Sequence, residues 1–174
     1  MDSTTHSVHN SIDHVATRLV SIAEASAAKP DLVTALQSES RERVAEIVLP
    51  LYGEIKAMNA INVFEIGDDQ GTVLFRGHNP DKFGDDKSGT KAIQVASEGR
   101  SIGGLEFGSS GISVRAFVPI MSNDKVIGTL QVGADDSFLD EMNRTLGIRD
   151  TDCDYRVGFC GCRFGADPFR NSTS

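Results

Sequence analysis

Two basic side chains, Arg76 and His78, stand two positions apart at the end of a predicted strand. Because side chains alternate between the faces of a strand, residues two apart can point to the same side. A third basic residue, Arg115, stands in the middle of another predicted strand, where a buried guanidinium needs an anionic partner. A guanidinium binds a carboxylate through two parallel hydrogen bonds. These residues predict a pocket for a small anion, and the alternative is an outward-facing Arg115 that pairs with Glu106.

A predicted turn adds hydroxyl and amide donors to the candidate site. It has the sequence Gly108-Ser109-Ser110-Gly111. Serine hydroxyls and backbone N–H groups both donate hydrogen bonds to an oxyanion. Ser109 and Ser110 are therefore weaker candidates for the same anion site, and an ordinary hairpin turn is the alternative.

The polar loop that contains His78 also carries carboxylates. A metal site would combine His78 with Asp81, Asp85 or Asp86, but one histidine with scattered aspartates follows no typical ligand spacing. The chain has no nucleophile motif, no reactive cysteine beside a histidine and no phosphate-binding glycine loop. We therefore expect no metal, no cofactor and no enzymatic activity. Asx turns and helix caps are the expected roles of the aspartates.

The three cysteines lie close together near the end of the sequence, at Cys153, Cys160 and Cys162. An odd number cannot form a closed disulfide framework, and no histidine lies nearby to complete a zinc site. A disulfide from Cys153 to either of the others and free thiols remain the alternatives.

Composition limits the classes of partner. The chain has 174 residues, of which 39% are hydrophobic and 24% charged, and its net charge is −8. Such a chain can form one domain with its own core, and its acidity argues against nucleic acid as a partner. Residues 71–120 nevertheless carry six basic and five acidic side chains, which supports an anion pocket unless the charges are merely scattered. No apolar run approaches the roughly 18 residues of a membrane span, and the N-terminus lacks the features of a signal peptide.

The first predicted helix covers residues 5–28. Its larger apolar residues are spaced alternately four and three positions apart, and they are Val8, Ile12, Val15, Leu19 and Ile22. This narrow stripe is typical of a helix that packs against one partner helix, either from the same chain or from a second copy. A homodimer through this helix is therefore one expectation.

Two more helices are predicted before the first strand. Pro30 ends the first helix, and Asp31 is the expected cap of the short second one. Ser40 and its neighbours are the expected cap of a third helix that continues through Met58, with Pro50 as a kink or a boundary.

After Asn59 the periodicity changes from helical to alternating. The predicted strands are 61–66, 72–76, 101–107, 112–120 and 126–132, with a helix over 89–98 capped by Ser88 and a final helix from Asp135 to about Leu146. Short connections make the strands antiparallel. We therefore predict an α+β fold in which long N-terminal helices precede a five-stranded antiparallel sheet and the helices lie on one face.

Three segments resemble a known family: GDDQGTVLFRGHNPDKFGDDKSG, GLEFGSSGISVRAFVPI and KVIGTLQVGADDSF. Together with the order of the elements, they resemble the extracytoplasmic, PAS-like Cache sensor domains of bacterial methyl-accepting chemotaxis receptors and sensor histidine kinases. The resemblance covers residues from about 31 to 140. We therefore predict a Cache domain over 31–146, after an N-terminal helix over 1–30 and before an irregular cysteine-containing tail over 147–174. In related carboxylate sensors, a histidine and an arginine at the positions of His78 and Arg115 contact the ligand.

The resemblance implies a ligand-binding sensor in signal transduction, with a small carboxylate as its ligand. The parent receptor would be a membrane protein of the chemoreceptor type, with this domain on the periplasmic side and transmembrane helices that this chain lacks. A histidine-kinase sensor is one alternative. Another is a ligand-free Cache module that serves dimerisation or signal relay. In a sensor, Arg76, His78 and Arg115 should lie in a cavity, whereas in a relay module they should be paired and closed.

Overall fold

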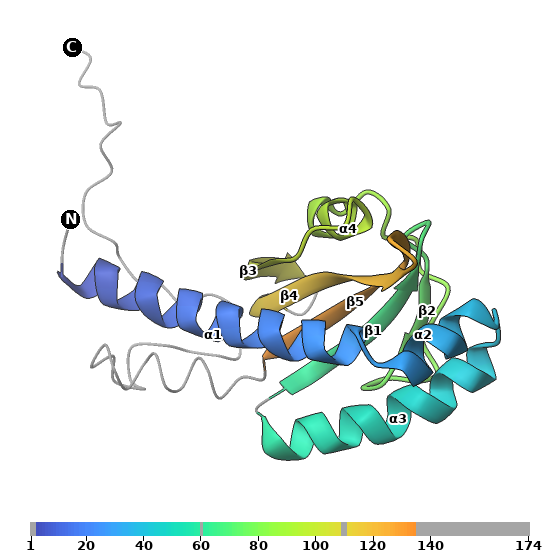
Figure 1. Ribbon diagram of the computed structural model, residues 1–174. Helices are drawn as coiled ribbons and strands as arrows, with labels where there is room; N and C mark the ends of the chain where they lie inside the picture. The colour runs from blue at the N-terminus through green and yellow to red at the C-terminus, as the bar shows by residue number, and fades with distance from the viewer. Residues whose placement is uncertain (1–2, 60, 109–110, 135–174) are drawn as a thin grey trace, which may run out of the picture.

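The structure is a computed structural model that describes residues 3–59, 61–108 and 111–134. Three helices come first, and they are α1 (Ser3–Ala27), α2 (Pro30–Gln37) and α3 (Arg41–Met58). Strands β1 (Ile61–Asp68) and β2 (Val73–Arg76), helix α4 (Lys91–Ser97) and strands β3 (Ile102–Gly108), β4 (Gly111–Ser122) and β5 (Lys125–Ala134) follow (Figure 1). The predicted final helix and the cysteine tail lie outside the described residues, and the predicted division of the chain at residues 30 and 146 stays a prediction.

The strands form one antiparallel sheet in the order β2-β1-β5-β4-β3, which confirms the predicted α+β fold. Strand β5 returns to the centre of the sheet and pairs with both β4 and β1. The tight β4–β5 turn contains Asn123 and Asp124, whose φ values of 48° and 62° suit a two-residue hairpin. Residues far apart in the sequence, from β1 and β5, therefore lie next to each other.

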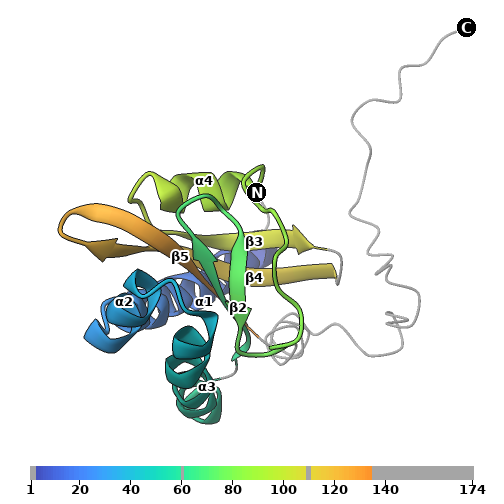
Figure 2. The ribbon, with the colours of Figure 1, turned by 90° about the vertical axis from the view of Figure 1, so that its right-hand side faces the viewer.

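The helices cover both faces of the sheet, so the prediction of helices on one face is wrong. Helices α1, α2 and α3 share the main core with one face. Helix α4 packs on the other face, where Ile93 and Ala96 contact Phe117 of β4 in a separate small cluster (Figure 2). A short amphipathic helix could cover either face, because its apolar residues do not specify which neighbour they meet.

The predicted N-cap residue is the observed one at α3 but not at α2 or α4. Ser40 caps α3 as predicted, since its hydroxyl accepts a hydrogen bond from the Arg43 amide at 3.3 Å. Lys29, rather than Asp31, occupies the N-cap position of α2, because the following proline takes the first helical position. The N-cap position of α4 is Thr90 rather than the predicted serine two residues earlier.

Pro50 does not divide α3, which runs without a break from Arg41 to Met58. Proline removes one backbone hydrogen bond inside a helix, and the carbonyl four residues earlier loses its partner. Both Pro50 and Glu46 are exposed, so water can satisfy that carbonyl.

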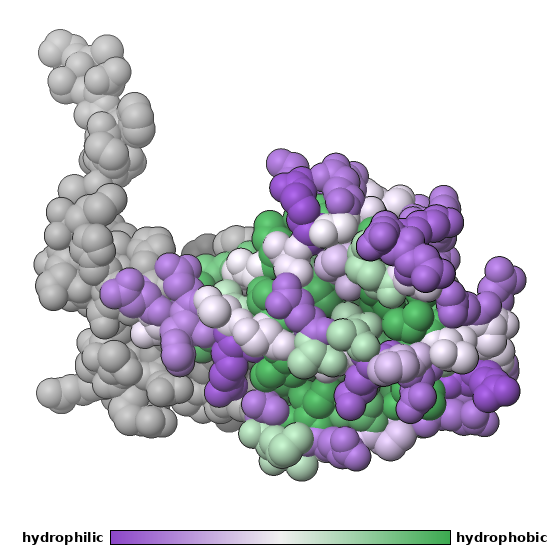
Figure 3. All heavy atoms as spheres, viewed as in Figure 1, coloured by the Kyte–Doolittle hydropathy of each residue, from purple (hydrophilic) through white to green (hydrophobic). Residues whose placement is uncertain are grey.

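Figure 3 shows hydrophobic residues gathered between α1 and α3, on the side of the molecule where these helices cover the sheet.

Helix α1 packs mainly against strands β3, β4 and β5 of its own sheet. From residue 10 onward, its buried apolar residues are Leu19 and three alanines: Ala16, Ala23 and Ala27. The alanines let the helix approach the sheet closely, because a Cβ built on Gly103 of β3 would lie 3.1 Å from the Ala16 carbonyl oxygen. The predicted stripe consists of large residues and leaves out these small ones, so it did not predict the contact with the sheet. The homodimer through α1 stays a prediction.

We expect Leu19→Ala to lower the free energy of unfolding by about 2–5 kcal/mol, because it leaves a cavity beneath the helix. Leu19 has no exposed surface, whereas its neighbour Arg18 is exposed. Arg18→Ala is therefore the matched control, with an expected change of no more than about 0.5 kcal/mol. Urea denaturation followed by circular dichroism measures both, and equal effects of the two substitutions would contradict this packing.

Candidate functional site

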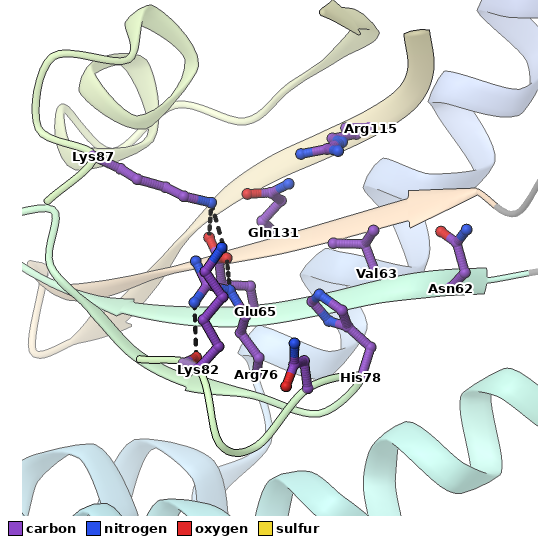
Figure 4. Close-up of a pocket in the computed structure, with 10 residues that line it drawn as sticks. Asn62, Val63, Glu65, Arg76, His78, Lys82, Lys87, Arg115 and Gln131 are labelled. Atoms are coloured by element: carbon purple, nitrogen blue, oxygen red, sulfur yellow. Dashed lines mark hydrogen bonds and ion pairs between the residues drawn. The ribbon is translucent and has the colours of Figure 1, made fainter. Parts of the chain in front are cut away.

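A polar cavity of about 310 Å³ opens on the face of the sheet opposite α1. It lies between the sheet and the loop that follows β2. The residues that line it are Asn62, Val63, Glu65, Arg76, His78, Asn79, Lys82, Lys87, Arg115 and Gln131 (Figure 4). Arg115 and His78 therefore line the same cavity, as the sequence predicted.

Its floor is a row of buried polar side chains that crosses the sheet in register. Arg76 of β2 stands opposite Glu65 of β1, and Glu65 stands opposite Gln131 of β5. These three residues are each at most 5% exposed. Arg115 of β4 extends the row on the same face. Four strands thus each contribute one polar residue to a sheet whose other face is apolar.

Glu65 is the anionic centre of this row. Arg76 Nε donates to its Oε2 at 2.6 Å, and Lys87 Nζ lies 2.6 Å and 2.8 Å from its two oxygens. The amide of Gln131, oriented so that both of its ends are satisfied, donates to Glu65 Oε1 at 3.0 Å and accepts from Arg115 Nη1 at 2.7 Å. Buried charges need this kind of pairing, because an isolated one is costly to remove from water.

Each nitrogen of the Arg76 guanidinium donates a hydrogen bond to the protein itself. Besides Glu65, Arg76 donates to the Lys82 carbonyl at 2.7 Å and to the Asp85 carboxylate at 2.5 Å. Burial alone would lower the pKa of Arg76, but the hydrogen bond to Asp85 and the charge of Glu65 raise it. The same bond holds the pKa of Asp85 below its usual value. Arg76 thus fixes the loop after β2 to the sheet.

Arg115 points into the cavity and is partly buried. Its Nε donates to Ser113 Oγ at 2.7 Å, and its Nη1 donates to Gln131. Both partners are neutral. Among the described residues, neither Glu106 nor any other carboxylate pairs with Arg115, so the alternative of an outward Arg115–Glu106 pair does not hold.

His78 lies at the other side of the cavity, where its Nδ1 is 3.2 Å from both the amide nitrogen and the carbonyl oxygen of Phe64. That carbonyl already accepts from the Gly77 amide at 2.9 Å. We therefore assign the Phe64 N–H as the donor to Nδ1, which leaves the ring proton on Nε2. Partial burial, the largest influence, lowers the pKa of His78. The hydrogen bond with the Phe64 backbone and the charge of Glu65 oppose this shift, and the nearby cations add to it, so that the net direction is downward.

We expect the stability of the protein to rise with pH around the ordinary pKa of histidine, 6.5, because His78 is harder to protonate in the folded chain. The unfolded state binds more protons just below that pH, so this contribution is present above pH 6.5 and is lost as pH falls through it toward the folded pKa. His78→Asn, whose side-chain oxygen can still accept from Phe64, should flatten the dependence. Melting temperatures of both proteins between about pH 5 and 8 measure it. Parallel curves would contradict the assignment of a neutral His78.

Several functional residues were missed by reasoning from sequence. Glu65, Lys82, Lys87 and Gln131 all line the cavity, and none was a candidate. Glu65 did carry a signal, because a charged residue stands there between Phe64 and Ile66 in a strand with little polar alternation. The positions of the other three depend on the loop path and the strand order.

The remaining candidates have different outcomes. Ser109 and Ser110 lie outside the described residues, so their role stays a prediction. Within the described ranges, no group of three or more histidine, cysteine or acidic side chains could hold a metal ion. Asp86 accepts from the Ser88 amide at 2.9 Å, which is the predicted Asx-type role.

In the part of the chain that the structure describes, no helix combines the length and apolarity that crossing a bilayer requires.

Solved structures share this fold. The E. coli DcuS sensor domain is 19% identical, with a TM-score of 0.58 over 77% of this chain and 98% of that domain. The V. cholerae histidine kinase DctB sensor domain is 16% identical, with a TM-score of 0.68 over 80% of this chain and 56% of that one. The ligand-binding domain of the Campylobacter jejuni chemoreceptor Tlp3, in complex with L-valine, is 15% identical, with a TM-score of 0.58 over 83% and 59%. This chain thus spans little more than half of the DctB and Tlp3 domains.

None of the curated proteins compared is significantly similar in sequence. A family model described as the double sensory domain of two-component sensor kinases matches residues 1–150. The match confirms the predicted resemblance to Cache-type sensor domains, and it covers all the strands and the cavity. The chain therefore belongs to the dCache_3 family of sensory domains.

Proposed function

We propose that the cavity binds a small anion, most simply a carboxylate, and that this module is a ligand-binding sensor. The observation that carries the proposal is the charge of the lining. Four cations, Arg76, Lys82, Lys87 and Arg115, line the cavity with one carboxylate, Glu65. The cavity thus has an excess of positive charge inside an acidic chain.

The cavity also has unused donors. Arg115 bonds only neutral oxygens, and Lys82 makes no ion pair with any described residue. His78, with its proton on Nε2, supplies a neutral donor on the side of the ring away from Phe64. A carboxylate that accepts from Arg115 and His78 would satisfy these groups with charge-assisted hydrogen bonds.

The alternative of a ligand-free relay module requires a paired and closed cluster. Arg76 is paired, but Arg115 and His78 line an open cavity. Two of the three candidate residues therefore support a sensor. Arg76 takes a positioning role in the proposal, because all its bonds go to the protein.

The location and output of the parent protein belong to the same proposal. We place the module on the periplasmic side of a membrane receptor, as the family of sensory domains suggests. The sequence favoured a chemoreceptor, and the likeness to Tlp3 is compatible with that output. The family description and the likeness to the histidine kinase DctB give the kinase alternative more support.

A thermal-shift screen tests the proposal on the full chain. Acetate, propionate, succinate, sulfate and phosphate are compared with chloride at equal ionic strength, and glycerol serves as a neutral control. A ligand at 100 times its Kd stabilises the native state by about 2.7 kcal/mol, which raises the Tm by several degrees, about 2–4 °C per kcal/mol. If no anion raises the Tm more than chloride does, the anion-binding function is wrong.

A further inference from the structure

We propose that the cavity selects anions that carry no ammonium group, and that Glu65 together with Lys87 sets this selectivity. The inference rests on the proposed anion-binding function. An α-amino acid presents a carboxylate and an ammonium within a few bond lengths. A cavity that accepts it must offer a cationic partner for the first group and an anionic partner for the second.

Among the described residues that line the cavity, Glu65 is the only one with a carboxylate. A carboxylate has about four lone-pair positions, two on each oxygen. Oε1 accepts from Lys87 at 2.6 Å and from Gln131 at 3.0 Å, and Oε2 accepts from Arg76 at 2.6 Å and from Lys87 at 2.8 Å. All four positions are occupied, as the convergence of these side chains on Glu65 illustrates (Figure 4).

An incoming ammonium would therefore have to displace a protein cation from Glu65. Arg76 cannot leave easily, because it is 5% exposed and also holds Asp85 and the Lys82 carbonyl. Lys87 is the replaceable partner, since its side chain is 27% exposed. Displacing it would leave both Lys87 and the ammonium among the other cations of the lining.

The other side-chain acceptors of the lining do not compensate. Asn62 and Asn79 offer amide oxygens, which are neutral, and the oxygen of Gln131 already accepts from Arg115. A ligand with a carboxylate and no amino group does not have to displace Lys87 from Glu65, because it needs only hydrogen-bond donors from the cavity. The occupied state of Glu65 thus converts a general anion site into one that rejects amino acids.

Matched pairs of compounds test this on the full chain. Titration calorimetry compares succinate with L-aspartate, glutarate with L-glutamate, and isovalerate with L-valine. We expect each pair's carboxylate to bind more tightly than its amino acid by about a factor of ten or more, because a charge left without a partner in the cavity is costly. Equal or tighter binding of the amino acids would overturn the inference while leaving the anion function intact. If no member of any pair binds, the inference fails, and the thermal-shift screen with the other anions decides separately whether the anion function stands.

A single substitution tests the mechanism of selection. Lys87→Met frees one acceptor position on each oxygen of Glu65 and removes one repelling cation. The variant should bind the amino acids more tightly than the unmodified protein does, while its affinity for the simple carboxylates stays equal or falls. Lys91→Met, the same substitution at an exposed position on α4, is the control and should change neither affinity. If the ratio of carboxylate affinity to amino-acid affinity is unchanged in Lys87→Met, Glu65 and Lys87 do not set the selectivity. If the variant does not fold, the same ratio in the unmodified protein still tests whether the cavity rejects amino acids.

Discussion

Arg115→Ala is expected to abolish the stabilisation of the protein by the best anion found in the thermal-shift screen. Arg115 is the partly buried guanidinium of the cavity, and its protein partners are the neutral Ser113 and Gln131. Removing the charged partner of a bound carboxylate costs about 2–5 kcal/mol, which weakens binding by roughly 30-fold to several thousand-fold. Calorimetric titration of both proteins measures the loss directly.

Two further variants make this result specific. Arg115→Lys keeps the charge but loses the forked geometry, so it should retain part of the affinity. Arg100→Ala removes an exposed arginine that pairs only with the exposed Glu98, and it should bind the anion as the unmodified protein does. Unchanged affinity in Arg115→Ala, with urea denaturation showing an intact fold, would remove Arg115 from the site and refute the proposed position of the ligand.

The buried pair Glu65–Arg76 is expected to be the second most sensitive feature. Glu65→Leu leaves Arg76 and Lys87 without their common partner, and Arg76→Met removes the strongest restraint on Glu65 and on the loop after β2. Breaking a buried ion pair from one side costs about 3–5 kcal/mol, because it leaves an uncompensated charge. Urea denaturation of the two single variants and the double variant measures the free energies of unfolding.

The double variant should lose much less than the sum of the two single losses, with a coupling energy of about 1–3 kcal/mol. The chain supplies a matched control in the pair Glu98–Arg100, whose bond length of 2.5 Å is similar but whose side chains are about two-thirds exposed. Its double-mutant cycle should give no more than about 0.5 kcal/mol, since water screens it. Equal coupling energies in the two cycles would contradict the structural role of the buried pair.

Much of the local structure follows from the sequence. The five strands appear close to their predicted positions, because alternating burial and turn residues are encoded over a few neighbouring positions. The Ser40 cap and the end of α4, after which Gly99 takes a φ of 83°, are likewise local. Candidate residues were found where an ionisable side chain stood in or beside a predicted strand, as Arg76, His78 and Arg115 do.

Which partner each of those side chains meets could not be predicted in the same way. The sequence offers Arg76 several partners, including a ligand, and the β1–β2 register selects Glu65. Gln131 joins the site only because β5 returns between β1 and β4. Lys87 joins it because the loop after β2 brings its ammonium over Glu65.

The sequence by itself determined the α+β class, the strand positions, the family and a basic pair, His78 and Arg115, that lines one cavity. Tertiary structure alone decided that α1 covers the sheet, that α4 covers the opposite face and that Arg76 pairs with Glu65 and Asp85. The physical reason is the distance along the chain over which each interaction acts. Periodicity and turn chemistry act between neighbours in the chain, whereas the strand order, the register and the pairing of buried charges minimise the free energy of contacts between distant segments.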